Sequence, residues 1–191
     1  MHFSDPIDFG LLQRIVARDT GALADLYDRH SRLLFGLILR IVRNRAEAED
    51  ILQEVFIRVW TRAGLYDPRL GSPMPWLVRL ARNCAIDRLR ARRIRDTAGS
   101  PVLDEAVAGP AASATDIRTP ETDVLDAERR GTVMDALAGL PAEQRRLIEA
   151  AFFEGYTHSE LANRFGLPLG TVKTRIRAGM IAMRQRLEQA V

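Results

Sequence analysis

One segment near the carboxyl end of the chain, residues 157–177, reads THSELANRFGLPLGTVKTRIR. Thr157 followed three residues later by Glu160 is the pattern of a capping box, so a short helix is expected to begin there. Gly166 then supplies a tight turn, and a second helix is expected to follow it. This order predicts a helix-turn-helix, a motif that presents its second helix to the major groove of DNA.

The spacing of apolar residues in this segment predicts how the two helices meet. Leu161 and Ala162 of the first helix are placed to pack against Val172 and Ile176 of the second. That packing leaves the start of the second helix exposed to a partner, and DNA is the leading candidate. The polar and cationic residues expected on this surface are Thr171, Lys173, Thr174, Arg175 and Arg177.

Charge is distributed unevenly along the 191 residues, although the formal net charge is only +3. Residues 79–95 hold seven arginines and one acid, and residues 161–187 hold five arginines, one lysine and no acid. Between them, residues 96–128 hold eight acids and one arginine. Clustered cations are typical of a surface that binds phosphates. For either basic segment taken alone, a solvated helix face remains the alternative.

Composition argues against several other classes of protein. The single cysteine, Cys84, provides neither a disulfide framework nor a thiolate cluster. The three histidines are scattered without the spacing of metal ligands. No apolar run approaches the roughly 20 residues of a membrane span, and the amino terminus has no signal-peptide pattern. We therefore expect a cytoplasmic protein without a metal or cofactor.

The middle of the chain predicts a division into two domains. Residues 96–123 carry glycines and prolines among small, polar and acidic residues, and helical periodicity is lost there. We predict an all-α protein with two helical domains, residues 1–95 and 124–191, joined by this flexible acidic linker.

Helical periodicity covers both expected domains. In the first, helices are expected at about 7–18, from a cap at Thr20 to about Val42, after a cap at Asn44, and at about 75–95. In the second, they are expected at about 121–138, 141–153, 157–165 and 168–189. Gly179 falls inside the last helix, where glycine costs roughly 1 kcal/mol relative to alanine, and the sequence offers no reason for it.

The helix after Asn44 has a distinct polar face. Its apolar residues fall in two neighbouring rows with a spacing of four, as in a helix that faces a core. They leave Asp50, Gln53 and Glu54 together on another face, with Ile57 beside them. This face suits a basic partner, and a solvated surface accounts for the same periodicity equally well.

The loop and helix around residue 75 suggest a second nucleic-acid site. A Gly- and Pro-rich loop, residues 65–75, precedes a helix with polar and cationic groups, a setting that suits unstacked single-stranded bases. An extruded base needs a pocket that hydrogen-bonds its edge. Asn83 carries a suitable amide, and the loop is placed to form the wall of such a pocket.

Three blocks of the chain, in this order, resemble the extracytoplasmic-function (ECF) sigma factors of bacterial RNA polymerase, a group of the sigma-70 family. Residues 46–60, AEAEDILQEVFIRVW, look like region 2.2 of that family. Residues 75–90, PWLVRLARNCAIDRLR, look like regions 2.3 and 2.4. Residues 140–177, which include the helix-turn-helix, look like region 4, and the linker before them also matches.

The resemblance implies a role for each surface. The face predicted to dock on the clamp helices of core polymerase is Asp50, Gln53 and Glu54. The residues implied in recognising and melting the −10 element are Arg79, Asn83, Asp87 and Arg88, with the 65–75 loop and Asn83 capturing a flipped base. The residues implied in reading the −35 duplex are Thr171, Lys173, Thr174 and Arg177. Residues 141–153 should also meet the polymerase flap, and the linker would replace region 3.

A member of this family is not an enzyme. Its implied partners are core RNA polymerase, promoter DNA and an anti-sigma factor, often anchored in the membrane, that contacts both domains. The chain departs from the family at one place: many members carry an aromatic residue or histidine followed by Arg-Ala-Arg after the recognition core. Here residues 175–180 read RIRAGM, which leaves the −35 sequence open.

Two other classes of protein account for the sequence less completely. A conventional helix-turn-helix regulator would bind duplex DNA without polymerase, usually as a dimer on a palindrome, but it leaves residues 76–95 without a role. A nuclease or integrase needs clustered carboxylates or a nucleophile, and the acids of the linker lie in a flexible segment that is poorly suited to a preorganised metal site.

Overall fold

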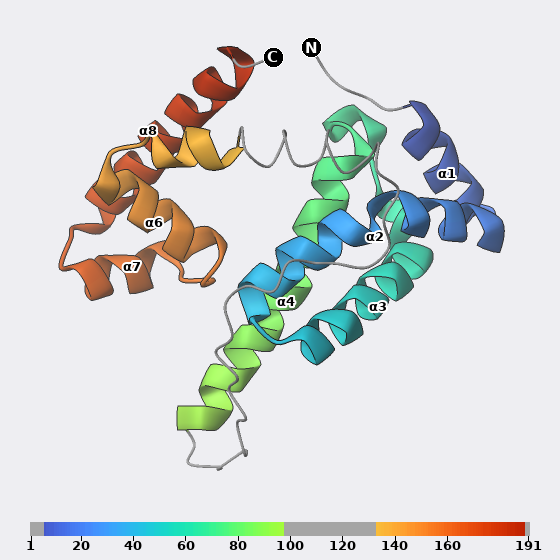
Figure 1. Cartoon of the computed structure of the whole chain (residues 1–191), viewed down its shortest axis with the longest axis horizontal. Coiled ribbons are helices and arrows are strands. Elements are labelled where there is room, and N and C mark those ends of the chain that lie inside the picture. Colours follow the sequence, from blue (N-terminus) through green and yellow to red (C-terminus); the bar gives the residue numbers. More distant parts are fainter. Residues whose placement is uncertain (1–5, 98–132, 190–191) are drawn as a thin grey trace. The chain divides into compact units, whose positions relative to one another are not determined.

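The structure is a computed structural model that describes residues 6–97 and 133–189. Within these two ranges the regular elements are all helices, which confirms the all-α prediction (Figure 1). The chain divides into two compact units, with the boundary between Val102 and Leu103. The predicted linker, residues 96–123, lies outside the described residues except for its first two, which end a helix.

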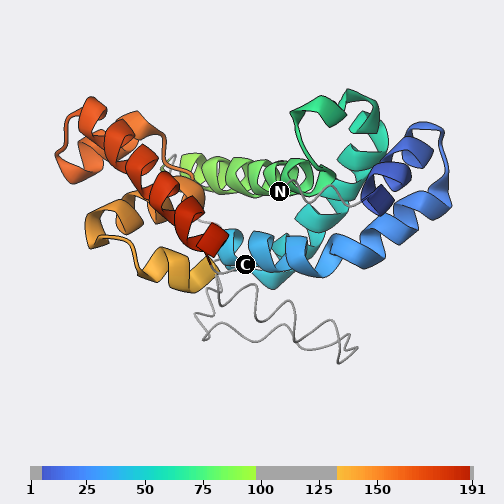
Figure 2. The same cartoon turned by 90° about the horizontal axis from the view of Figure 1, so that it is seen from above.

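The N-terminal unit is a bundle of four α-helices. The long helix α2 packs against α1, α3 and α4, and α3 also packs against α4. Figure 2 shows the same bundle from above. Its interior includes Leu26, Ile38, Ile51, Val55 and Leu77, all fully buried. The elements are α1 (Pro6–Val16), α2 (Thr20–Val42), α3 (Arg45–Arg62), the short 3-10 helices η1 (Ala63–Leu65) and η2 (Pro68–Leu70), and α4 (Pro73–Thr97).

The start of α2 corrects one prediction. Asp19, rather than Thr20, caps this helix, because its Oδ1 accepts a hydrogen bond from the Ala22 N–H at 3.2 Å. Arg18 takes a left-handed conformation at φ 67° and turns the chain out of α1. Asp19 then holds the extended backbone of a cap, and its carboxylate also pairs with Arg14 at 2.8 Å. Thr20 is the first helical residue.

Helix α3 follows its predicted pattern. Asn44 caps it by accepting from the Glu47 N–H at 3.0 Å. Both apolar rows face the core, where Ile51, Leu52, Val55, Phe56 and Val59 are buried. The α3 surface that carries Asp50 and Gln53 is left exposed.

The C-terminal unit has the predicted helix-turn-helix. Thr157 and Glu160 form a capping box at the start of α7 (His158–Phe165), and Gly166 ends it with a left-handed φ of 62°. Val172 of α8 (Leu169–Gln189) is fully buried with Leu161, and Ile176 packs on the same cluster. Residues 133–138 and α6 (Ala142–Phe152) complete the described part of the unit, whereas residues 121–132 of an expected helix lie outside it.

Two classes of feature are missing from the described part of the chain. None of its helices combines the length and apolar character needed to cross a membrane. No cluster of histidine, cysteine, aspartate and glutamate side chains among residues 6–97 and 133–189 is arranged to hold a metal ion.

Candidate functional site

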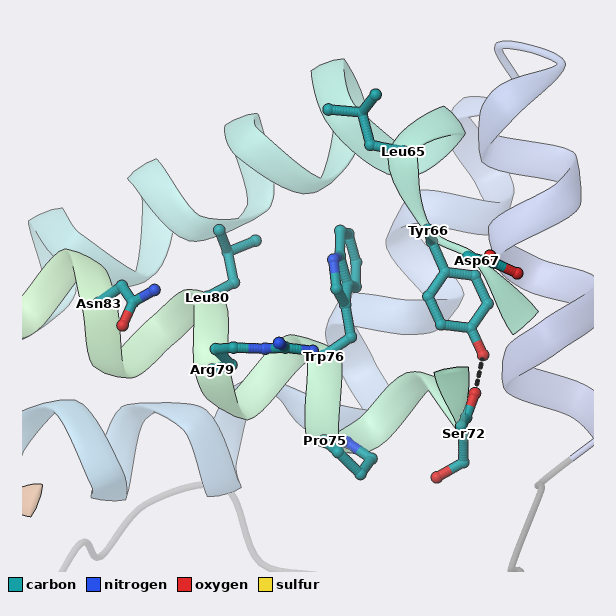
Figure 3. A pocket seen from close by; sticks show the side chains of 10 residues that line it. Leu65, Tyr66, Asp67, Ser72, Pro75, Trp76, Arg79, Leu80 and Asn83 are labelled. Carbon is teal, nitrogen blue, oxygen red and sulfur yellow. Dashed lines mark hydrogen bonds between the residues drawn. The ribbon is translucent and has the colours of Figure 1, made fainter. Parts of the chain in front are cut away.

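A pocket of about 310 Å³ lies in the N-terminal unit, between the segment that follows α3 and the first turns of α4 (Figure 3). This volume is at the lower end of the range for small-ligand pockets. The predicted wall, residues 65–75, and the predicted reader, Asn83, therefore border one cavity. The residues that line it are Leu65, Tyr66, Asp67, Gly71, Ser72, Pro75, Trp76, Arg79, Leu80 and Asn83.

Tyr66 holds the wall of this pocket together. Its hydroxyl donates a hydrogen bond to the Gly71 carbonyl oxygen at 2.6 Å, which ties the two ends of the loop. Gly71 has a φ of 130°, a conformation that favours glycine. The Tyr66 ring also packs on Trp76 with centroids 5.8 Å apart. Burial raises the pKa of Tyr66, and the neighbouring Asp67 carboxylate adds to this, so the hydroxyl stays a donor.

The Asp67 carboxylate lines the pocket, and it is hydrogen-bonded within its own loop. Its Oδ1 accepts from the Arg69 backbone N–H at 2.9 Å and from the Arg69 guanidinium at 3.0 Å. These hydrogen bonds lower the pKa of Asp67. The carboxylate is therefore ionised at neutral pH, and its charge is balanced by Arg69.

Polar residues line one row of α4. Arg79, Asn83 and Asp87 are exposed at successive intervals of four residues, so they are neighbours along the helix. Arg79 and Asn83 border the pocket, whereas Asp87 and the half-buried Arg88 lie on the following turn. Two of the four residues predicted for the −10 element, Arg79 and Asn83, therefore border the pocket. Asp87 extends their row by one turn beyond it.

Two aromatic residues of the lining were not individually predicted from the sequence: Tyr66, which lies within the predicted 65–75 wall, and Trp76. In Figure 3 the Trp76 ring stands between Tyr66 and Leu80, within the pocket lining. Aromatic residues on both sides of a Gly- and Pro-rich loop would have been the available signal, because flat rings stack on unpaired bases. Cys84, by contrast, is buried, and burial raises the pKa of its thiol, as expected for a small packing residue.

The acidic face of α3 is largely open. Asp50 and Gln53 are exposed, Glu54 is half-buried, and Ile57 beside them is 62% exposed. Glu54 forms an ion pair with Arg58, one turn further along the helix. A partner that binds Glu54 must therefore compete with an internal arginine.

The start of α8 carries the predicted cations, with one correction. Lys173 and Arg177 are exposed and four residues apart. Arg175 was expected on the same open surface, but its side chain is only 33% exposed and pairs with Glu143 of α6 at 2.8 Å. The reason is the position of Arg175 around the helix axis, because it lies beside Ile176 on the side of α8 that faces α6.

The two threonines of this surface differ in their surroundings. Thr171 is half-buried, and Thr174 is exposed. The Thr174 hydroxyl donates to the Gly170 carbonyl oxygen at 2.9 Å. Its hydrogen is thus used within the helix, so this side chain can offer a partner its methyl group and an oxygen that accepts.

Two family descriptions match the chain, one in each unit. Sigma-70 region 2 matches residues 26–94, and Sigma-70, region 4 matches residues 136–185. These ranges contain the pocket and α3 in the first case, and the helix-turn-helix in the second.

Full-length relatives match as well. The chain is 35% identical to an ECF RNA polymerase sigma factor SigK of Mycobacterium sp. (strain KMS), over 89% of this chain and 85% of the relative. It is 35% identical to an ECF RNA polymerase sigma factor RpoE of Cereibacter sphaeroides, over 96% of this chain and 97% of the relative. Among solved structures, Rhodobacter sphaeroides SigE in complex with the anti-sigma ChrR is 34% identical, covering 93% of this chain and 96% of that one with a TM-score of 0.44.

Proposed function

This chain belongs to the ECF sigma factors of bacterial RNA polymerase, in the sigma-70 family, and we propose which of its surfaces perform each step of that role. A sigma factor is a non-catalytic subunit that binds core RNA polymerase and directs it to promoters through the −35 and −10 elements. The N-terminal unit takes the −10 element, and the C-terminal unit takes the −35 element.

The pocket beside α4 carries the −10 proposal. It receives one extruded base, with the Trp76 ring as a stacking surface. The Asn83 amide offers both a donor and an acceptor to the edge of that base. Arg79, exposed at the pocket border, neutralises the adjoining phosphate. Further along the same helix, Asp87 and Arg88 continue the contacts to the melted strand.

The exposed start of α8 carries the −35 proposal. Lys173 and Arg177 enter the major groove, where both side chains can donate to the acceptors of guanine. Thr174 presents its methyl group, since its hydroxyl is bonded to Gly170, and a methyl suits contact with thymine. Thr171 completes the surface. Arg175 is held by Glu143 and is left out of it.

The acidic face of α3 carries the docking proposal. Asp50, Gln53 and Glu54 meet cationic groups of core polymerase, and the exposed Ile57 contributes apolar area at the centre. Opposite charges on the two partners steer their encounter and fix its register. The Glu54–Arg58 pair opens as the polymerase replaces Arg58.

Three further elements of the proposal come from family membership. Residues 1–95 and 124–191 act as the two domains, and the linker, residues 96–123, replaces region 3 between them. The protein works in the cytoplasm beside the polymerase. An anti-sigma factor, which in this family is often membrane-anchored, holds the protein inactive until a signal releases it.

A run-off transcription experiment tests the proposed function. Core polymerase is incubated with a pool of promoter templates, with and without this protein, and the active templates are sequenced. We expect initiation only when the protein is added, with shared −35 and −10 sequences among the active templates. Absence of stimulation, together with tight binding of duplex DNA by the protein alone, would instead support a conventional helix-turn-helix regulator.

A further inference from the structure

Helix α1 packs against η1, and its Phe9 adds a ring contact to the loop that forms the wall of the pocket. The ring of Phe9 meets the ring of Tyr66 edge-on, with centroids 6.3 Å apart and planes at 65°. Tyr66 in turn packs on Trp76 at 5.8 Å. Three rings from α1, the loop and α4 thus form one row, in which Tyr66 and Trp76 line the pocket and Phe9 does not.

The position of Phe9 is fixed by its neighbour Asp8. Asp8 is 2% exposed and is the one charged residue buried among the described residues. Its two oxygens face α2, where one accepts from the Arg29 Nε at 2.9 Å and the other bonds the His30 Nε2 at 2.8 Å. Sliding α1 along α2 would leave a buried carboxylate without these partners, which is strongly unfavourable.

The other side of Tyr66 is fixed by the loop itself. Its hydroxyl bonds the Gly71 carbonyl oxygen at 2.6 Å, and the Gly71 N–H donates to the Pro68 carbonyl oxygen at 3.4 Å. Tyr66 is therefore contacted at its ring by Phe9 and held at its hydroxyl by Gly71. Beside it in the pocket lining stands the Trp76 ring, tilted by 59° against the Tyr66 ring (Figure 3).

We propose that Tyr66 is a positioning residue of the pocket and that α1 braces it through Phe9, so that the choice of the extruded base depends on a helix outside the pocket. This inference rests on the proposed function of the pocket. The row of rings sets where the Trp76 ring stands relative to Asn83. A shift of that ring moves the base away from the amide that reads its edge, which lowers discrimination between bases more than overall affinity.

The test measures base preference in the holoenzyme. Core polymerase carrying this protein is bound to fork-junction promoter DNAs that hold each of the four bases, or an abasic site, at each position of the −10 element. Asn83→Ala identifies the pocketed position as the one at which preference is lost. At that position we expect Tyr66→Phe and Phe9→Ala to reduce the ratio of best to worst affinity about 2- to 10-fold, the range for one hydrogen bond or ring contact.

The controls separate positioning from general destabilisation. Gln13→Ala changes an exposed residue of α1 and should keep the full preference. On the abasic template, Tyr66→Phe should bind like the unaltered protein, and −35 preference should be unchanged. If Phe9→Ala fails to fold, Phe9→Leu, which keeps an apolar side chain but removes the ring, carries the test of the brace, and Tyr66→Phe tests the hydroxyl bond to Gly71.

The possible failures are distinguishable. If Asn83→Ala removes preference at one position while Tyr66→Phe and Phe9→Ala leave it intact, the brace is refuted and the proposed function stands. Equal weakening on all bases and on the abasic template would also refute it, because that is the result of a loosened fold. If Asn83→Ala changes preference nowhere, the proposed role of the pocket fails, and the brace fails with it.

Discussion

A Cβ atom added to Gly179 of α8 would stand 2.6 Å from the Cδ1 atom of Ile148 on α6. Real side chains do not approach so closely, and the Gln144 Cβ lies 3.3 Å from the same point. Ile148 is buried in a cluster with Leu137 and Leu140, so its end is not free to swing away. Gly179 therefore permits α8 to lie close against α6, which supplies the reason for glycine that the sequence did not offer.

The first prediction concerns this contact. Gly179→Ala gains about 1 kcal/mol of helix propensity, but overpacking of a buried contact costs about 1–3 kcal/mol. We expect a net loss in the free energy of unfolding of about 1 kcal/mol. Ile148→Val removes the clashing Cδ1, so the double variant should be more stable than the sum of the single changes implies. Urea unfolding of the four proteins measures this coupling.

A matched glycine on the same helix provides the control. Gly170 has open space where a Cβ would stand, so Gly170→Ala should not lower stability. Strict additivity of Gly179→Ala and Ile148→Val would contradict the proposed contact.

The second prediction concerns the cap of α2. The pKa of Asp19 is lowered by its hydrogen bonds from Arg14 and from the Ala22 N–H. The pKa of Asp19 in the folded protein lies below its ordinary value of 3.8. The contribution of Asp19 to stability is therefore fully present above pH 3.8 and is lost as the pH falls through the folded-state pKa. We expect Asp19→Asn, which keeps an oxygen acceptor but no charge, to show a shallower fall in melting temperature below pH 4.

Thr20→Ala is the matched control for the cap. Thr20 is the first helical residue and makes no cap contact to Ala22, so this change should leave both the melting temperature and its pH dependence nearly unaltered. Identical pH profiles for Asp19→Asn and the unaltered protein would show that the Arg14 pair adds nothing to stability.

Local signals allowed the sequence to predict much of this fold. The capping box at Thr157 and the turn at Gly166 each depend on residues a few positions apart, and both are present. The apolar rows of α3 were equally local. The prediction of a cap at Thr20 was wrong because the position of the cap depends on where α1 ends. Arg18 takes the left-handed conformation after α1, and Asp19, the next residue, is therefore the one that caps α2.

Features that join distant segments were not predictable in this way. The contact of Phe9 with Tyr66 spans more than fifty positions, and no periodicity links an aromatic residue in one helix to a loop so far along the chain. The pairing of Arg175 with Glu143 depends likewise on the rotation of α8 against α6. The borders of the pocket were visible in sequence as a loop and an amide, and aromatic residues flank that loop, but the packing of Tyr66 on Trp76 required the fold.

The third prediction tests the docking face of α3. Asp50→Arg reverses an exposed charge on this face and should weaken binding to core polymerase on the order of tenfold or more, since it places like charges together at an interface. Competition against a labelled sigma factor for core polymerase measures the change. Asp25→Arg is the control, because Asp25 is an exposed acid on α2 rather than α3, and its ion pair with Arg14 is long, at 3.7 Å. Equal losses from both variants would mean that overall charge, rather than this face, governs binding.

The fourth prediction tests base reading by α8. Lys173→Ala or Arg177→Ala should each cost about 1–3 kcal/mol in holoenzyme binding to the preferred −35 duplex if the side chain contacts a base. Arg184→Ala is the control: Arg184 lies two turns beyond Arg177 on nearly the same side of α8 and is exposed, paired with Glu188 at 2.9 Å. Binding is measured at several salt concentrations on preferred and scrambled −35 sequences. A loss confined to the preferred sequence identifies a base contact, whereas a uniform loss with a reduced salt slope identifies a phosphate contact. If Lys173→Ala and Arg177→Ala both behave like Arg184→Ala, these two residues do not read the −35 element.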